Sequence, residues 1–130
     1  GEEGGGAGRR STSIGPLMQI LRSGSEAAKE SAARVVWTLN DGDATRLAIT
    51  EAGGVALLVA LLRSAAADSA REAAALALAN LAVAQENKTA IAREQGIDAL
   101  VMVLHSGGAP AKEAAARALL ELAVNHLNRV

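Results

Sequence analysis

The 130-residue chain has no cysteine, no phenylalanine and no tyrosine, and it contains a single tryptophan. Without cysteine it can form no disulfide and offers no thiolate to zinc, and its two histidines cannot complete a tetrahedral metal site without carboxylates. Its aromatic residues, 1% of the chain, are too few to stack the bases of RNA or single-stranded DNA. These absences predict a protein without metal, cofactor or nucleic-acid partner.

The chain also lacks an excess of charge of either sign. Thirteen basic and 14 acidic residues give a formal net charge of −1, so no bulk attraction draws the protein to nucleic acid or to an anionic membrane. No apolar run reaches the ~18 residues of a membrane span, and no signal peptide opens the chain. We therefore expect an intracellular protein, cytoplasmic or nuclear, that does not bind membranes.

Alanine and leucine are abundant, with 31 and 17 residues. Both favour helices, whereas the β-branched and aromatic residues typical of strands are sparse, so the composition predicts an all-α fold. Residues 1–13 differ from the rest, because they are rich in glycine and have no apolar side chain larger than alanine. We expect them to form a flexible tail ahead of one ordered domain over residues 14–130.

Three copies of one unit account for most of that domain. The segment 71–83 is identical to 112–124 at nine of thirteen positions, and 29–40 fits the same frame 42 residues earlier. Two shorter elements recur in the same order around these segments, which is the pattern of a repeat protein. The repeats cover about 14–43, 44–85 and 86–127.

Each unit predicts one short, one medium and one long helix. Ser69 and Glu72 form a capping-box pattern at the start of a long helix, and Asp43 is a favourable N-cap for a short one. The Gly53-Gly54 turn opens a medium helix. The expected helices cover residues 14–22, 25–40, 44–50, 54–63, 69–84, 87–93, 96–105 and 110–126.

Two motifs of the second copy carry a family resemblance. Ile49 to Leu62 reads I-x-E-A-G-G-V-x-x-L-V-x-L-L, and Ala77 to Ala82 reads A-L-A-N-L-A. With its three helices, the unit resembles the armadillo repeat, which implies a right-handed α-solenoid of about three repeats whose third helices line a concave groove. A HEAT-type solenoid of helix pairs is the alternative, and the short first helix and the Gly-Gly turn argue against it.

The resemblance also implies where a partner binds. In peptide-binding armadillo proteins an Asn on the third helix holds the partner's backbone, and a Trp one turn earlier often stacks on its side chains. Asn80 alone keeps the Asn position, and no copy keeps the Trp, which puts binding of nuclear-localisation signals in doubt. Residues four apart share a helix face, which predicts groove residues Glu30, Arg34, Thr38, Glu72, Leu76, Asn80, Glu113, Arg117 and Glu121.

Several of these residues also have a structural explanation. Glu113 and Arg117 are spaced as an ion pair on a solvated helix face, as are Glu30 and Arg34. Asn80 either caps loose backbone groups in the adjoining turn or serves a ligand. Trp37, one residue before the Asn position, either packs between repeats or is a partly exposed anchor for a partner.

The function predicted from these patterns is non-enzymatic binding of a peptide or protein in the groove. The chain shows no catalytic triad and no convincing pair of catalytic carboxylates. One alternative is the substrate-binding part of a larger ubiquitin ligase, because such arrays resemble the substrate-binding arms of plant U-box ligases.

A second alternative is a structural module that assembles with copies of itself. A solenoid buries each repeat against its neighbours, so apolar residues at the two ends of the array lack a cover and favour a homo-oligomer. The face at one end should expose some of Ile14, Leu17, Val35 and Trp37, and Leu119, Leu122 and Leu127 lack a cover at the other.

Overall fold

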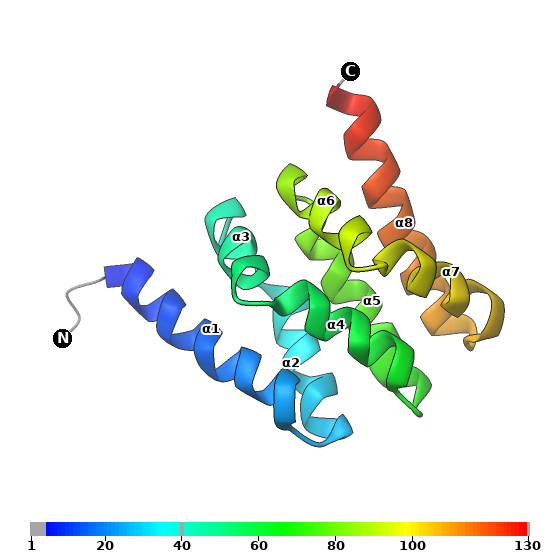
Figure 1. Ribbon diagram of the computed structural model, residues 1–130, viewed down its shortest axis with the longest axis horizontal. Coiled ribbons are helices and arrows are strands. Elements are labelled where there is room, and N and C mark those ends of the chain that lie inside the picture. Colours follow the sequence, from blue (N-terminus) through cyan, green and yellow to red (C-terminus); the bar gives the residue numbers. More distant parts are fainter. Residues whose placement is uncertain (1–4, 40, 130) are drawn as a thin grey trace.

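The computed structural model describes the backbone of residues 5–39 and 41–129, and the side chains of residues 14–39 and 41–123. Within these residues the chain forms eight α-helices and no strand (Figure 1), as the composition predicts. The helices are α1 (Gly5–Ser23), α2 (Glu26–Thr38), α3 (Asp43–Glu51), α4 (Gly54–Ser64), α5 (Asp68–Leu81), α6 (Gln85–Arg93), α7 (Gly96–Ser106) and α8 (Ala109–Arg129). Their ends agree with the expected helices to within three residues, except at the start of α1.

The start of α1 is where the structure differs most from the sequence prediction. The helix begins at Gly5, whereas the sequence predicts order from about Ile14, and Pro16 lies inside the helix. Starting a helix is costly but extending one is cheap, so a helix over 14–23 continues into the preceding residues despite their glycines. Residues 1–4 lie outside the described residues, and the flexibility of the segment 1–13 stays a prediction.

Two expected helix caps are wrong. α5 begins at Asp68, and the Ser69 hydroxyl donates to Glu30 Oε1 at 3.0 Å instead of capping the helix. Asp43 is the first residue of α3 and not its N-cap, and its carboxylate accepts a hydrogen bond from Arg46 Nη1 at 2.8 Å. In both cases a neighbouring polar side chain engages the oxygen that was expected to cap the helix.

The turn from the short to the medium helix depends on a left-handed residue. Gly53 has φ +93° before α4, as the Gly-Gly motif predicts, and Gln95 takes the same place before α7 with φ +66°. The next residue in each copy is a buried glycine. A Cβ at Gly96 would lie 2.6 Å from Ile91 Cγ2, so this turn brings α7 tightly against α6.

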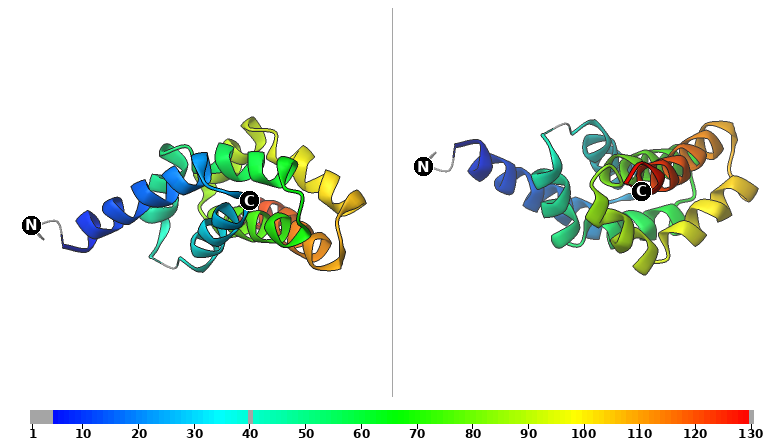
Figure 2. Two further views of the ribbon diagram at one scale, coloured as in Figure 1. Left: turned by 90° about the horizontal axis from the view of Figure 1, so that it is seen from below. Right: turned by 90° about the horizontal axis from the view of Figure 1, so that it is seen from above.

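The helices form a solenoid with two main rows. α2, α5 and α8 pack side by side, α1, α4 and α7 form the second row against them, and α3 and α6 lie along one edge. Figure 2 shows the two rows from opposite sides. The third helices of the three units therefore lie next to one another, which is the arrangement that a shared binding face requires.

The core between the rows consists mostly of alanine and leucine. Every residue of α5 from Ala73 to Ala79 is buried, and so are Leu58 and Leu62 of α4. The small alanine side chains let α5 approach α2 on one side and α8 on the other. No single helix among the described residues is both long and apolar enough to cross a membrane; α3 and α4 pass that test only as a pair, bent by 71°.

The same contact joins each unit to the next. The Glu26 carboxylate, in the first turn of α2, accepts the backbone N–H groups of Ala66 at 3.1 Å and Ala67 at 2.8 Å. One unit later, Asp68 of α5 accepts the backbone N–H of Gly108 at 2.7 Å. We call these contacts the inter-repeat clasps. The N–H groups of Ala66 and then Ala67 lower the pKa of the Glu26 carboxyl, because they stabilise its charged form.

Candidate functional site

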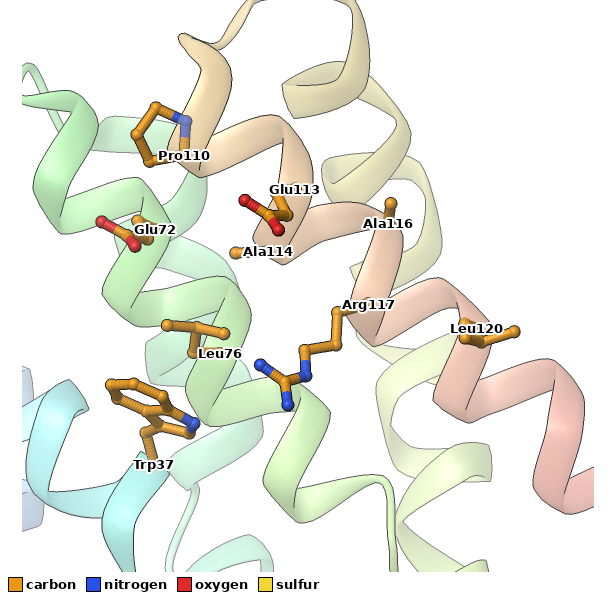
Figure 3. Close-up of a pocket in the computed structure, with 9 residues that line it drawn as sticks. All are labelled: Trp37, Glu72, Leu76, Pro110, Glu113, Ala114, Ala116, Arg117 and Leu120. Carbon is orange, nitrogen blue, oxygen red and sulfur yellow. The ribbon is translucent and has the colours of Figure 1, made fainter.

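A cleft of about 600 Å³ opens between α5 and α8 (Figure 3). It is lined by Trp37, Glu72, Leu76, Pro110, Glu113, Ala114, Ala116, Arg117 and Leu120. A smaller hollow of about 200 Å³ shares Trp37, Leu76 and Arg117 with it and adds Ala79, Asn80, Val83 and Glu121. We call the two together the α5–α8 cleft.

Six of the nine predicted groove residues border the α5–α8 cleft, and Trp37 joins them. The six are Glu72, Leu76, Asn80, Glu113, Arg117 and Glu121. The three residues of α5 and the three of α8, each spaced by four, thus lie along the same cleft. The other three predicted residues, Glu30, Arg34 and Thr38 of α2, line neither part of the cleft.

The α2 residues are engaged in structural contacts instead. Arg34 Nη2 lies 3.3 Å from Glu30 Oε2 on its own helix and 3.9 Å from Glu72 Oε1 on α5. The Thr38 hydroxyl donates to the backbone oxygen of Val35 at 2.9 Å. Arg34 therefore joins α2 to α5 and compensates part of the charge of Glu72.

Asn80 binds the end of the neighbouring third helix. Its Nδ2 donates to the backbone oxygens of Val36 at 2.7 Å and Leu39 at 3.0 Å, and its Oδ1 accepts from Arg46 Nε at 3.0 Å. Both amide protons are thus in use. Of the two roles that the sequence leaves open, the structure supports capping of the adjoining turn.

A contact equivalent to that between Arg46 and Asn80 occurs one unit later, between Lys88 and Glu121. Lys88, at the position of Arg46 in the unit, donates from Nζ to the backbone oxygens of Ala82 and, at 3.1 Å, of Glu121. The sequence analysis did not identify Arg46 or Lys88 as part of the site. The available signal was that both basic residues occupy the same position in the short helix of their units.

The centre of the cleft is apolar. Trp37 is 38% exposed and Leu120 61% exposed, whereas Leu76, beside Trp37, is only 5% exposed. Trp37 is thus a partly exposed residue of this face. The sequence did not predict Leu120 as a site residue, but it occupies the same position of the unit as Trp37 and Ala79, and that match was the available signal.

Glu113 and Arg117 do not form the ion pair that their spacing predicts. Neither has an ion pair or hydrogen bond with any described residue, in contrast to Glu30 and Arg34. In Figure 3 the Arg117 side chain extends from α8 across the cleft toward Trp37 and Leu76, and the Glu113 carboxylate points out nearer Pro110. The described residues contain no group of three or more His, Asp or Glu side chains that could hold a metal ion.

Comparisons with known proteins agree with this architecture. A family model described as the armadillo/β-catenin-like repeat matches residues 42–83, which is the second unit. No curated protein matches the chain.

Three solved structures of engineered proteins resemble the fold. Two engineered proteins solved by the Northeast Structural Genomics Consortium match with TM-scores of 0.78 and 0.77 and identities of 33% and 34%. The matches cover 84% and 83% of this chain, and 44% and 26% of those proteins. A designed armadillo repeat protein in complex with the peptide (KR)4 matches with a TM-score of 0.76 and 25% identity, over 88% of this chain and 47% of its own.

The chain spans less than half the length of each of these structures. The short helix of the second and third units nevertheless excludes a solenoid of simple helix pairs. Residues 42–83 thus match an armadillo repeat, and the fold of the described residues is similar to that of a designed armadillo repeat protein.

Proposed function

We propose that the chain is a non-enzymatic interaction module that binds an extended peptide or protein segment in the α5–α8 cleft. Armadillo repeats are typically protein-interaction modules, and the designed relative is in complex with a peptide. The observation that carries the proposal is the apolar part of the cleft lining, where Trp37 and Leu120 are partly exposed. Partly exposed Trp residues are enriched among the residues that dominate binding energies.

In this proposal the side chains of the cleft provide the recognition, rather than a row of asparagines. Asn80 already binds Val36, Leu39 and Arg46. Thr38 and Glu121 occupy the equivalent positions in the other units. A partner would therefore gain most of its affinity from apolar contact with Trp37 and Leu120.

Peptides selected from a display library for binding to the chain test the proposal. Leu120→Ala removes exposed apolar surface without opening the core, so it should weaken a selected peptide about five- to thirtyfold, the range of a moderate hot spot. Ile97→Ala on α7 is the matched control, because Ile97 is a partly exposed aliphatic residue outside the cleft. Equal losses from the two variants would place binding elsewhere.

A second candidate, assembly with a further copy of the chain, rests on the two end faces. Val101 of α7 is 38% exposed, whereas Val59, its equivalent in the second unit, is 5% exposed. Ile20 of α1 is 38% exposed, whereas its equivalent Leu61 is 3% exposed. Val59 and Leu61 lie in the second unit, which has a neighbouring unit on each side. Val101 and Ile20 lack such a neighbour, so a unit of another copy could cover them in the same way.

Of the residues predicted at the first end face, Val35 is 43% exposed and Trp37 38% exposed, as expected of some of that set. Ile14 is buried, because its position faces the next unit rather than the outside, as the equivalent Val55 does. Leu17, Leu119 and Leu122 are half-buried. The side chain of Leu127 lies outside the described residues.

Sedimentation velocity at high micromolar concentration tests the assembly. The chain should sediment as a dimer or larger species, and Ile97→Lys/Val101→Lys should return it to a 13.1 kDa monomer. Val83→Lys is the control, because Val83 is an equally exposed valine away from both ends. A monomer at every concentration would contradict self-assembly. The role as part of a ubiquitin ligase and the intracellular location stay predictions.

A further inference from the structure

Two opposite charges of the α5–α8 cleft have no partner within the described part of the chain. These are Glu113 and Arg117 on α8. The other acids that border the cleft lie beside cations. Glu72 is 3.9 Å from Arg34, and Lys88 Nζ lies 3.1 Å from the backbone oxygen of Glu121.

The two unpaired charges lie at different levels of the cleft, with the apolar side chains of Ala114 and Leu76 between those levels. They are four residues apart on α8, which separates their Cα atoms by about 6 Å along the helix axis. Figure 3 shows Arg117 reaching down toward Trp37 and Leu76, while the Glu113 carboxylate lies higher, near the level of Glu72. The cleft therefore presents an anion, an apolar surface and a cation in sequence.

Resting on the proposed function, we infer that the cleft selects a segment of mixed charge. The segment carries one large apolar side chain, with a basic residue on the Glu113 side and an acidic residue on the Arg117 side. In an extended peptide, residues two apart lie on one face about 6.6 Å apart, and the residue between them points to the opposite face. A peptide lying between α8 and α5 can therefore turn its two charges toward Glu113 and Arg117 and its apolar side chain toward Trp37 and Leu76. A uniformly basic segment would place one cation against Arg117, and a uniformly acidic one would place an anion against Glu113.

Three synthetic peptides of eleven residues test this preference. They share a Gly/Ser frame and differ only at the centre, which is Lys-Leu-Asp, Lys-Leu-Lys or Asp-Leu-Asp. Binding is measured by NMR titration of the labelled protein, with the Trp37 indole and the Arg117 Nε as reporters. The Lys-Leu-Asp peptide should bind about two- to fivefold more tightly than either of the others, because each of those replaces one of its ion pairs with repulsion.

Charge reversal on the protein should reverse the order. Arg117→Glu should make Lys-Leu-Lys the tightest peptide, and Glu113→Lys should make Asp-Leu-Asp the tightest. Both side chains are exposed, so neither change should disturb folding. Arg22→Glu, on α1 outside the cleft, should leave the order unchanged.

The outcomes separate this inference from the proposed function. If the unchanged protein binds Lys-Leu-Lys or Asp-Leu-Asp in the cleft more tightly, the mixed-charge inference is wrong and the cleft remains a peptide site. Retention of the original order by Arg117→Glu would overturn the inference in the same way. If no peptide shifts the cleft resonances at millimolar concentration, the proposed function itself fails.

Discussion

The side chain of Asn80 holds together groups from three helices. Asn80→Ala would leave the backbone oxygens of Val36 and Leu39 without this donor, and Arg46 without its acceptor. We expect it to lower the free energy of unfolding by about 1–3 kcal/mol, the usual cost of leaving buried polar groups unpaired, as measured by urea denaturation.

Thr38→Ala is the matched control for Asn80, because Thr38 holds the same position in the first unit and bonds only within its own helix. It should cost less than about 0.5 kcal/mol, as an exposed substitution does. Equal costs at the two positions would mean that the Asn80 contacts contribute little to stability.

Glu26 provides a prediction about pH. Its pKa is lowered in the folded chain by the N–H groups of Ala66 and Ala67. A carboxyl with a lowered pKa stabilises the fold above its unfolded pKa of about 4.3, and this stabilisation is lost as the pH falls through the folded value. The protein should therefore be more stable than Glu26→Gln at pH 7, and the difference should shrink below about pH 4.3.

Urea midpoints of the two proteins at several pH values check this expectation. Glu94→Gln is the control, since Glu94 is exposed and makes no side-chain hydrogen bond to a described residue. A difference between the protein and Glu26→Gln that stays constant down to pH 3 would show that the charge of this carboxylate does not stabilise the fold.

Among the elements, the turn before each medium helix allows a paired test. Gln95→Gly should stabilise the chain by up to about 1 kcal/mol, because glycine adopts the left-handed conformation at no steric cost. Gly53→Ala should destabilise it by a similar amount, since alanine at φ +93° is strained. Thermal melts followed by circular dichroism measure both, and shifts of the same sign would contradict the conformational explanation.

The helices were predictable because each rule they obey acts within a few residues. The spacing of Leu78 and Leu81, the Gly53-Gly54 turn and Pro110 near the start of α8 are all local signals. The start of α1 was not predictable in this way, because glycine-rich residues become helical only as an extension of the stable helix on their C-terminal side.

The sequence predicts which residues of α5 and α8 line the cleft, but not which hydrogen bonds and ion pairs these residues form. Repeat spacing places Leu76 and Arg117 on the cleft. Whether Asn80 binds a ligand or Val36 depends on how close α2 lies to α5, and whether Glu113 meets Arg117 depends on side-chain rotamers. The spacing of residues along one helix determines neither the distance between helices nor the side-chain rotamers.

At the scale of the whole molecule, contacts between units should make unfolding cooperative. The inter-repeat clasps and Asn80 each join consecutive units, and in repeat proteins such interface terms couple the stability of neighbours. Trp37 is the only tryptophan and lies where the first two units and α8 meet. We expect its fluorescence and the helical circular dichroism to report the same urea transition.

A fluorescence transition at lower urea than the loss of helix would contradict this expectation, because it would mean that the first unit unfolds by itself. Glu26→Gln, which weakens the first clasp, should separate the two transitions if the clasp carries the coupling.

The inter-repeat clasps also bear on how such an array changes its length. Each clasp pairs one carboxylate with backbone N–H groups of the next unit, and backbone donors are present whatever the side chains there are. Tandem duplication of a 42-residue segment that includes Asp68 would copy an acceptor at one junction and supply donors at the other. Units could therefore be gained or lost without compensating mutations at the joints, so natural selection could adjust the extent of the binding face independently of its chemistry.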